Sequence, residues 1–224
     1  MRLLLLSSGL GAVPAFLEEA TGRSGPLRIA YVPDAALPLP DAALPDAARP
    51  EPGAPFASEE RDRLAALGHD VEVVRVGGAP LARIESALDR VDAVYVAGGN
   101  TFVLLHALRS RGADAAIVRR VRAGLPYVGL SAGSVVAGPT IAPIAPMDDA
   151  SEAPGLSDLA ALGLVDVVVV PHADGLSYPR TVIDRIVAES GATHPLRLLT
   201  DEEALLVDDA GTHLVPSRLT PPRV

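Results

Sequence analysis

The sequence predicts a three-layer α/β sandwich, in which a mostly parallel, doubly wound sheet carries helices on both faces. Its short runs of leucine and β-branched residues are continuously apolar rather than alternating, as expected of strands that are covered on both sides. Helical stretches lie between these runs, and such alternation is typical of a parallel sheet. The chain has 224 residues, a length that suits one sizeable domain. We therefore expect residues 1–224 to form a single α/β domain.

Turn residues bound each expected element. The expected strands are residues 3–6, 27–32, 71–76, 93–96, 127–130, 165–170 and 204–207. The expected helices are residues 12–21, 58–67, 80–90, 101–111, 113–123, 134–137 and 180–190. Residues 34–56 break the pattern because they are dense in proline and alanine, which predicts a long loop that is either a lid or an inert insertion.

Composition limits the function. The net charge of −9 argues against a nucleic-acid partner, because binding phosphates requires a clustered basic surface. The chain has no cysteine, which excludes disulfides, thiolate metal sites and a cysteine nucleophile. We expect neither a metal nor a cofactor.

The N-terminus resembles a short secretory signal, since Met1-Arg2 precedes an apolar run at residues 3–6. The run breaks at Ser7-Ser8-Gly9, however, and a buried first strand explains the same residues. No run approaches the roughly 20 apolar residues that span a bilayer. We expect a cytoplasmic protein with no membrane partner.

The clearest chemical motif is Gly129-Leu130-Ser131-Ala132-Gly133, which follows an expected strand and precedes an expected helix. This is the context of a nucleophile elbow, whose glycines allow a sharp strand-to-helix turn that exposes the serine hydroxyl. The N–H of Ala132 could then face a developing oxyanion. As a pattern alone, the motif also fits an ordinary turn of small residues.

A second glycine turn follows the strand at residues 93–96. Gly98 and Gly99 would let a backbone N–H approach a ligand, and Asn100 and Thr101 can cap the next helix or bind substrate. Both glycine turns lie at the carboxyl ends of parallel strands, where open α/β sheets bind ligands. A plain capped helix is the alternative interpretation.

A serine nucleophile requires a base and an acid that orients it. Among the five histidines, only His172 closes an expected strand at that edge of the sheet. Three candidates remain for the acid: Asp148, Asp174 and Glu202. The sequence does not decide among them.

Several blocks resemble the peptidase E (aspartyl dipeptidase) family, which includes cyanophycinase-like enzymes and shares the fold of class I glutamine amidotransferases. These blocks are residues 96–102, 129–133, 139–141 and 171–172. The resemblance implies Ser131 as nucleophile, His172 as base and oxyanion donors from Ala132, Gly98 and Gly99. It places the acid at Asp148 or Glu202.

The resemblance also implies a catalytic domain that hydrolyses small peptides, Asp-Xaa dipeptides in particular, through an acyl-enzyme on Ser131. Arg180 falls near the family's arginine for the acidic side chain of the substrate. Alternatives are a cyanophycinase-like or other small amide or ester hydrolase, or a catalytically silent binding domain. The expected partner is a small peptide, and a homodimer is a further possibility.

Overall fold

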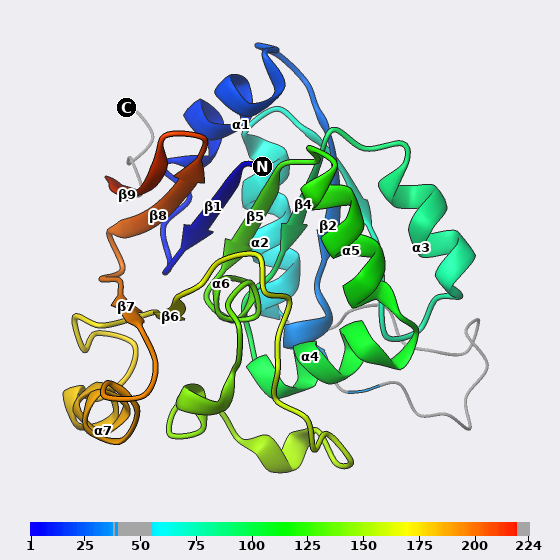
Figure 1. The fold of residues 1–224 in the computed structure, drawn as a ribbon. Coiled ribbons are helices and arrows are strands. Elements are labelled where there is room, and N and C mark those ends of the chain that lie inside the picture. The colour runs from blue at the N-terminus through cyan, green and yellow to red at the C-terminus, as the bar shows by residue number, and fades with distance from the viewer. Residues whose placement is uncertain (38, 40–54, 219–224) are drawn as a thin grey trace.

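The main sheet has the mostly parallel order that was expected. In the computed structural model, which describes residues 1–37, 39 and 55–218, its strand order is β3-β2-β4-β5-β1-β8-β9 (Figure 1). The strands are β1 (Leu3–Leu6), β2 (Arg28–Val32), β3 (Asp70–Val73), β4 (Ala93–Val96), β5 (Tyr127–Leu130), β8 (Glu203–Asp208) and β9 (Gly211–Pro216). The first five run parallel to one another, and β8 and β9 are antiparallel additions at the edge beside β1. The α/β fold class is confirmed.

Helices cover both faces of this sheet (Figure 1). They are α1 (Val13–Thr21), α2 (Pro55–Ala66), α3 (Leu81–Leu88), α4 (Thr101–Ser110), α5 (Ala113–Arg122), α6 (Ala132–Val135) and α7 (Arg180–Ser190). Helices α3, α4, α5 and α6 contribute to one buried cluster, while α1 and Leu64 of α2 contribute to the other.

The strand β1 shows why the expected strands are apolar throughout. Leu3 and Leu5 belong to the cluster on one face of the sheet, and Leu4 and Leu6 belong to the cluster on the other. All four are at most 1% exposed, because successive side chains of a strand point to opposite faces. Burial of both faces therefore requires apolar residues at every position.

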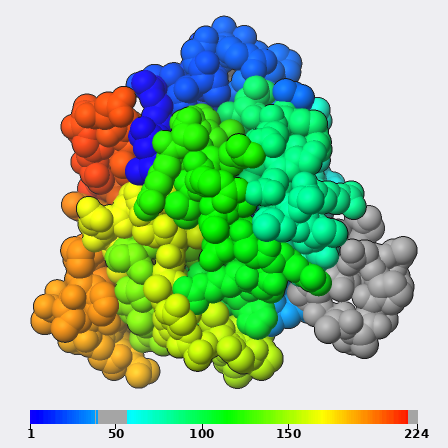
Figure 2. Space-filling view, turned by 45° about the vertical axis from the view of Figure 1, so that its right-hand side comes forward, coloured from blue at the N-terminus to red at the C-terminus, as the bar shows by residue number. Residues whose placement is uncertain are grey.

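The carboxyl ends of the parallel strands meet a smaller substructure. A parallel pair of strands, β6 (Val168–Val170) and β7 (Leu196–Leu198), flanks α7 at this end of the molecule (Figure 1). In Figure 2 the orange segment of α7 forms one corner, while the red β8–β9 hairpin lies against the blue N-terminal segment. This substructure brings the segment after β6 next to the end of β5.

Some expected boundaries were wrong. The sequence reading missed β7 and β9, and β6 begins at Val168 rather than at residue 165. The helix α2 begins at Pro55, inside the loop expected at residues 34–56. A 3₁₀ turn occupies Asp34–Ala36, and residues 38 and 40–54 of that loop lie outside the described residues. No helix in the described chain is long and apolar enough to cross a membrane.

Candidate active site

Ser131 occupies a strained turn between β5 and α6. Its backbone has φ 46° and ψ −107°, and its N–H donates to the Leu6 carbonyl at 3.0 Å. A Cβ at Gly129 would lie 2.5 Å from the Gly133 carbonyl oxygen, and a Cβ at Gly133 would lie 2.1 Å from the Val96 carbonyl oxygen. Both glycines are therefore required by close backbone contacts, in the way that a sharp strand-to-helix turn demands.

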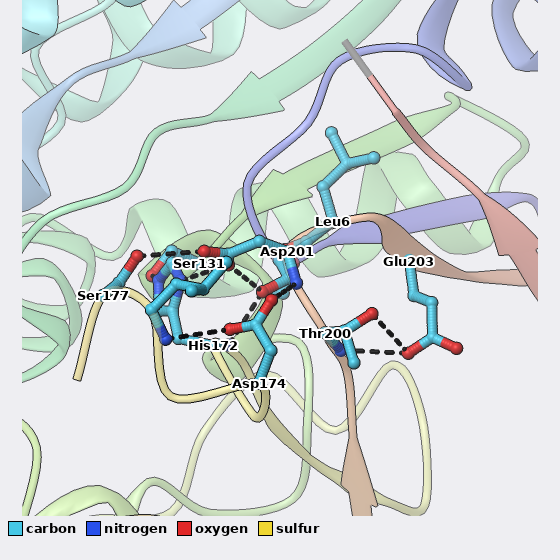
Figure 3. A network of polar contacts seen from close by, with 11 residues as sticks. Leu6, Ser131, His172, Asp174, Ser177, Thr200, Asp201 and Glu203 are labelled. Carbon is cyan, nitrogen blue, oxygen red and sulfur yellow. Dashed lines mark hydrogen bonds and ion pairs between the residues drawn. The ribbon is translucent and has the colours of Figure 1, made fainter. Parts of the chain in front are cut away.

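A chain of hydrogen bonds leads from Ser131 into the protein. The Ser131 Oγ lies 3.0 Å from His172 Nε2, and His172 Nδ1 lies 2.5 Å from Asp201 Oδ1 (Figure 3). The side chains of His172 and Asp201 are 12% and 16% exposed. The hydroxyl, imidazole and carboxylate thus form the arrangement in which an acid orients a base toward a nucleophile.

Other polar groups hold Asp201 in place. Its Oδ1 also accepts from the Ser7 hydroxyl and its Oδ2 accepts from the Ser177 hydroxyl, both at 3.0 Å. The Asp201 N–H donates to Asp174 Oδ2 at 2.9 Å, and the His172 N–H donates to Ser7 Oγ at 2.8 Å. Ser7 therefore joins the backbone of the histidine to the carboxylate that contacts its ring.

Ser131 and His172 share a backbone feature. Among the described residues, they are the only non-glycine residues with positive φ, 46° and 58°. Such conformations cost of the order of 1–3 kcal/mol and persist where the surrounding structure enforces them, typically at functional sites. The residues that the sequence predicts as nucleophile and base are thus the two with strained backbone conformations.

The acid that contacts His172 differs from every candidate taken from the sequence. Asp174 binds the Asp201 N–H, and Glu202 forms an exposed ion pair with Arg218 at 2.8 Å. Asp201 was missed although it precedes Glu202, because neighbouring residues of a turn point in different directions and the sequence does not show which one faces inward. The only sequence feature that pointed to Asp201 was its place beside the candidate acid Glu202, in Thr200-Asp201-Glu202.

Asp148 contacts Tyr178, whose ring lies beside His172. Its Oδ2 accepts from the Thr101 N–H at 2.9 Å, and its Oδ1 accepts from the Tyr178 hydroxyl at 3.4 Å. The Tyr178 ring lies 5.5 Å from the His172 ring, centroid to centroid. Burial raises the pKa of Asp148, against the lowering effect of its hydrogen bonds and of His172. The expectation that Asp148 binds the imidazole directly is therefore corrected.

The second glycine turn is built by close packing. Gly99 has φ 136°, and a Cβ there would lie 2.2 Å from the Ala35 carbonyl oxygen. Asn100 caps α4 by accepting from the N–H groups of Phe102 and Val103, and its amide donates to the Asp149 carbonyl. The Asn100 side chain is thus engaged in capping and in holding the loop after α6, away from the substrate role expected for it.

Thr101 and Arg180, two further residues expected to bind substrate, also make contacts elsewhere. Thr101 is 1% exposed and its N–H holds Asp148, so it supports the loop rather than facing a substrate. The Arg180 guanidinium donates to the Ala173 carbonyl at 3.1 Å and to Asp184 at 3.3 Å. Neither residue lines the cavity beside Ser131.

That cavity has a volume of about 370 Å³. Ser131, His172, Gly99 and Tyr178 contribute to its wall, together with Glu60 and Arg63 of α2. Sequence reasoning missed Glu60 and Arg63, because nothing in an ordinary charged helix shows which residues the fold turns toward the site. Within the described chain, no group of three or more His, Asp or Glu side chains is placed to hold a metal ion.

Comparisons with known proteins agree over nearly the whole chain. The model of peptidase family S51 matches residues 3–215. An uncharacterised peptidase of Listeria monocytogenes is 30% identical over 97% of this chain and 98% of its own length. Peptidase E of Streptomyces coelicolor is 39% identical over 77% of this chain and 64% of its own length.

Solved structures show the same fold. A crystal structure of a candidate peptidase E from Listeria monocytogenes has a TM-score of 0.78 and 29% identity, covering 96% of this chain and 98% of that one. A peptidase of an acI-B1 actinobacterium has a TM-score of 0.67 at 17% identity, over 96% of this chain and 87% of that one, and supports the fold alone. This chain belongs to peptidase family S51, the family of peptidase E, and is a serine-type peptidase.

Proposed function

We propose that the protein hydrolyses small peptides through an acyl-enzyme on Ser131, with His172 as general base and Asp201 as the acid that orients it. The observation that carries this proposal is the continuous hydrogen-bond chain from Ser131 Oγ through His172 to Asp201. Each neighbour is within the reach expected between a nucleophile, its base and the orienting group.

The reaction balances without a cofactor. Ser131 Oγ attacks the peptide carbonyl carbon as its proton passes to His172 Nε2, and the same proton then goes to the departing amine. Water repeats the sequence on the ester, with His172 again taking and returning a proton, and releases the acid product. Asp201 stays ionised and stabilises the imidazolium that forms in each half-reaction.

Two backbone N–H groups are proposed to hold the oxyanion. Within the described residues, the N–H groups of Ala132 and Gly99 have no protein acceptor. Ala132 directly follows the nucleophile, as in other strand–serine–helix turns, and Gly99 lines the cavity. The Gly98 N–H instead faces the Glu60 carboxylate, so the oxyanion role expected for Gly98 passes to Gly99 alone.

The cavity favours a small substrate. Its volume of about 370 Å³ lies near the lower end of the roughly 300–1,000 Å³ typical of small-molecule sites. Arg180, the residue expected to bind the acidic side chain of an Asp-Xaa substrate, lies outside this cavity. Arg63 is an arginine that does line the cavity, and we propose it as the partner of an acidic substrate group.

A dipeptide panel with two serine variants tests this function. Wild-type protein and Ser131→Ala are assayed on Asp-Leu, Ala-Leu and a phenyl ester. The alanine variant should remain folded and lose about six orders of magnitude in kcat, as serine proteases do when they lose the nucleophile.

Ser8→Ala is the matched control, because Ser8 is an exposed serine that lines the same cavity. It should keep its activity. Undiminished turnover in the purified Ser131→Ala variant would refute the mechanism, and turnover of the ester without any dipeptide would move the substrate class to esters.

A further inference from the structure

Glu60 is a buried carboxylate for which the site described so far has no use. It lies on α2, is 4% exposed and contributes to the wall of the cavity that also contains Ser131 and His172. Within the described residues, the Gly98 N–H and the Tyr95 hydroxyl face the carboxylate, but neither of its oxygens accepts a hydrogen bond of ordinary geometry. Buried charges in proteins are normally paired, so a carboxylate left in this state at a cavity wall indicates a missing partner.

The groups around Glu60 do not satisfy it. Burial raises its pKa to about 7, while Tyr95, the Gly98 N–H and Arg63 lower it. The Tyr95 hydroxyl faces Glu60, but among the described residues it makes no hydrogen bond of ordinary geometry. The nearby Tyr31 hydroxyl already donates to the Ala57 carbonyl at 2.9 Å. Apart from the Arg63 guanidinium, the groups named here are uncharged, and a further cation can reach Glu60 from the cavity that it lines.

The place of Glu60 relative to the reacting centre suggests which cation. The Gly98 N–H faces the Glu60 carboxylate, while the next residue, Gly99, lines the cavity and is proposed to donate to the oxyanion. In a peptide, the amino nitrogen of the first residue is only two covalent bonds from that residue's carbonyl carbon, a path of about 3 Å along the backbone. A first residue whose carbonyl faces Gly99 and Ser131 thus brings its amino group to the same side of the turn.

We propose that Glu60 binds the α-ammonium group of the first residue of the substrate and so requires a free amino terminus. This inference rests on the proposed function, because it concerns the same cavity and the same peptide carbonyl. It assigns recognition of the amino terminus in this cavity to Glu60, and it gives a partner to a carboxylate that none of the described residues pairs. The Tyr95 hydroxyl can donate to the carboxylate once the ammonium group has ionised it.

Two substrates of nearly the same shape, one with and one without an amino group, test whether Glu60 recognises the ammonium charge. Ala-Leu and propionyl-Leu differ only in the amino group, and both are assayed with wild type and with Glu60→Gln, which keeps the size of the side chain. Loss of a charged partner from a buried site corresponds to roughly 30-fold or more in kcat/KM. Wild type should therefore prefer Ala-Leu by at least that factor, and the variant should lose the preference.

Asp62→Asn is the control, because Asp62 is an exposed carboxylate on the same helix that does not line the cavity. It should preserve the preference for Ala-Leu. An equal loss on both substrates in Glu60→Gln, or an unchanged preference, would overturn the inference. A selective loss on Lys-Leu relative to norleucyl-Leu, with Ala-Leu unaffected, would show that Glu60 reads a basic side chain instead and would also overturn it.

A binding measurement keeps the inference independent of turnover. Calorimetric titration of Ser131→Ala with Ala-Leu and with propionyl-Leu should show binding of the first that is at least tenfold tighter, and Glu60→Gln in the same background should abolish the difference. Failure of wild type to cleave any peptide would refute the proposed function, whereas equal affinity for the two ligands would refute the role of Glu60.

Discussion

Asp201 and Glu60 are carboxylates close to the same cavity, and the fold surrounds them very differently. Asp201 accepts from His172, Ser7 and Ser177, and Asp174 holds its N–H. Glu60 is more deeply buried, yet within the described chain its carboxylate faces only the Gly98 N–H and the Tyr95 hydroxyl and accepts no hydrogen bond of ordinary geometry. A saturated carboxylate is suited to fixing the orientation of another residue, whereas an unsaturated one is suited to a partner that arrives from solvent.

Of the substitutions that test this difference between the two carboxylates, we expect Asp201→Asn to have the largest effect on kcat. Asp201→Asn retains the size of the side chain but removes the charge that stabilises the imidazolium and selects its tautomer. An equivalent change in a serine protease lowers kcat by about four orders of magnitude, and we expect a loss of similar size here. Steady-state kinetics on the best dipeptide of the panel provide the measurement.

Two variants serve as controls for Asp201. Asp148→Asn keeps an acceptor for the Thr101 N–H and should cost less than about tenfold, because Asp201, not Asp148, is hydrogen-bonded to His172. Glu202→Gln alters an exposed ion pair and should leave activity within about twofold. A larger loss in Glu202→Gln than in Asp201→Asn would assign the acid to Glu202.

The second prediction concerns how the free energy of unfolding depends on pH through the ionisation of Glu60. Its pKa of about 7 in the folded protein exceeds the ordinary value of 4.5, so the folded state holds the proton more tightly than the unfolded state does. Stability therefore falls as the pH rises between these two values, and the full cost of ionising the buried group is present above pH 7. Glu60→Gln cannot ionise and should gain about 2–3 kcal/mol at pH 8 but little at pH 5.

Urea denaturation of wild type and Glu60→Gln at the two pH values measures this difference. Glu59→Gln, at the neighbouring exposed position, should change stability by no more than about 0.5 kcal/mol at either pH. If Glu60→Gln raised the free energy of unfolding equally at pH 5 and pH 8, the stabilisation would arise from packing and not from ionisation. Glu60 would then no longer differ from Asp201 as an unpaired buried charge.

The smallest effect is expected at Arg180. Its guanidinium is about two-thirds exposed and binds the Ala173 carbonyl and Asp184, outside the cavity. Arg180→Met should therefore change kcat/KM for Asp-Leu and for Ala-Leu by less than about threefold, and by the same factor. A loss confined to Asp-Leu would restore Arg180 as the residue that reads the acidic side chain, whereas such a loss in Arg63→Met would support the cavity residue.

The sequence by itself determined the fold class and the serine turn. Strands such as residues 3–6 and 127–130 could be found because burial on both faces demands an unbroken apolar run. The turn at Ser131 could be found because only glycine tolerates the backbone contacts at positions 129 and 133, which leaves a local pattern. His172 was selected by its place after a strand, and the structure brings its ring to Ser131.

Only the tertiary structure decided which charged side chains face the site. The choice of Asp201 over Glu202 depends on the direction of one turn, which is set by contacts with Ser7 and Asp174 far away in the chain. Arg180 was given a role by its position in the sequence, but hydrogen bonds at the start of α7 hold it elsewhere. Glu60 left no mark in the sequence, because a carboxylate becomes unusual only when packing removes it from water, as here, where none of the described residues pairs it.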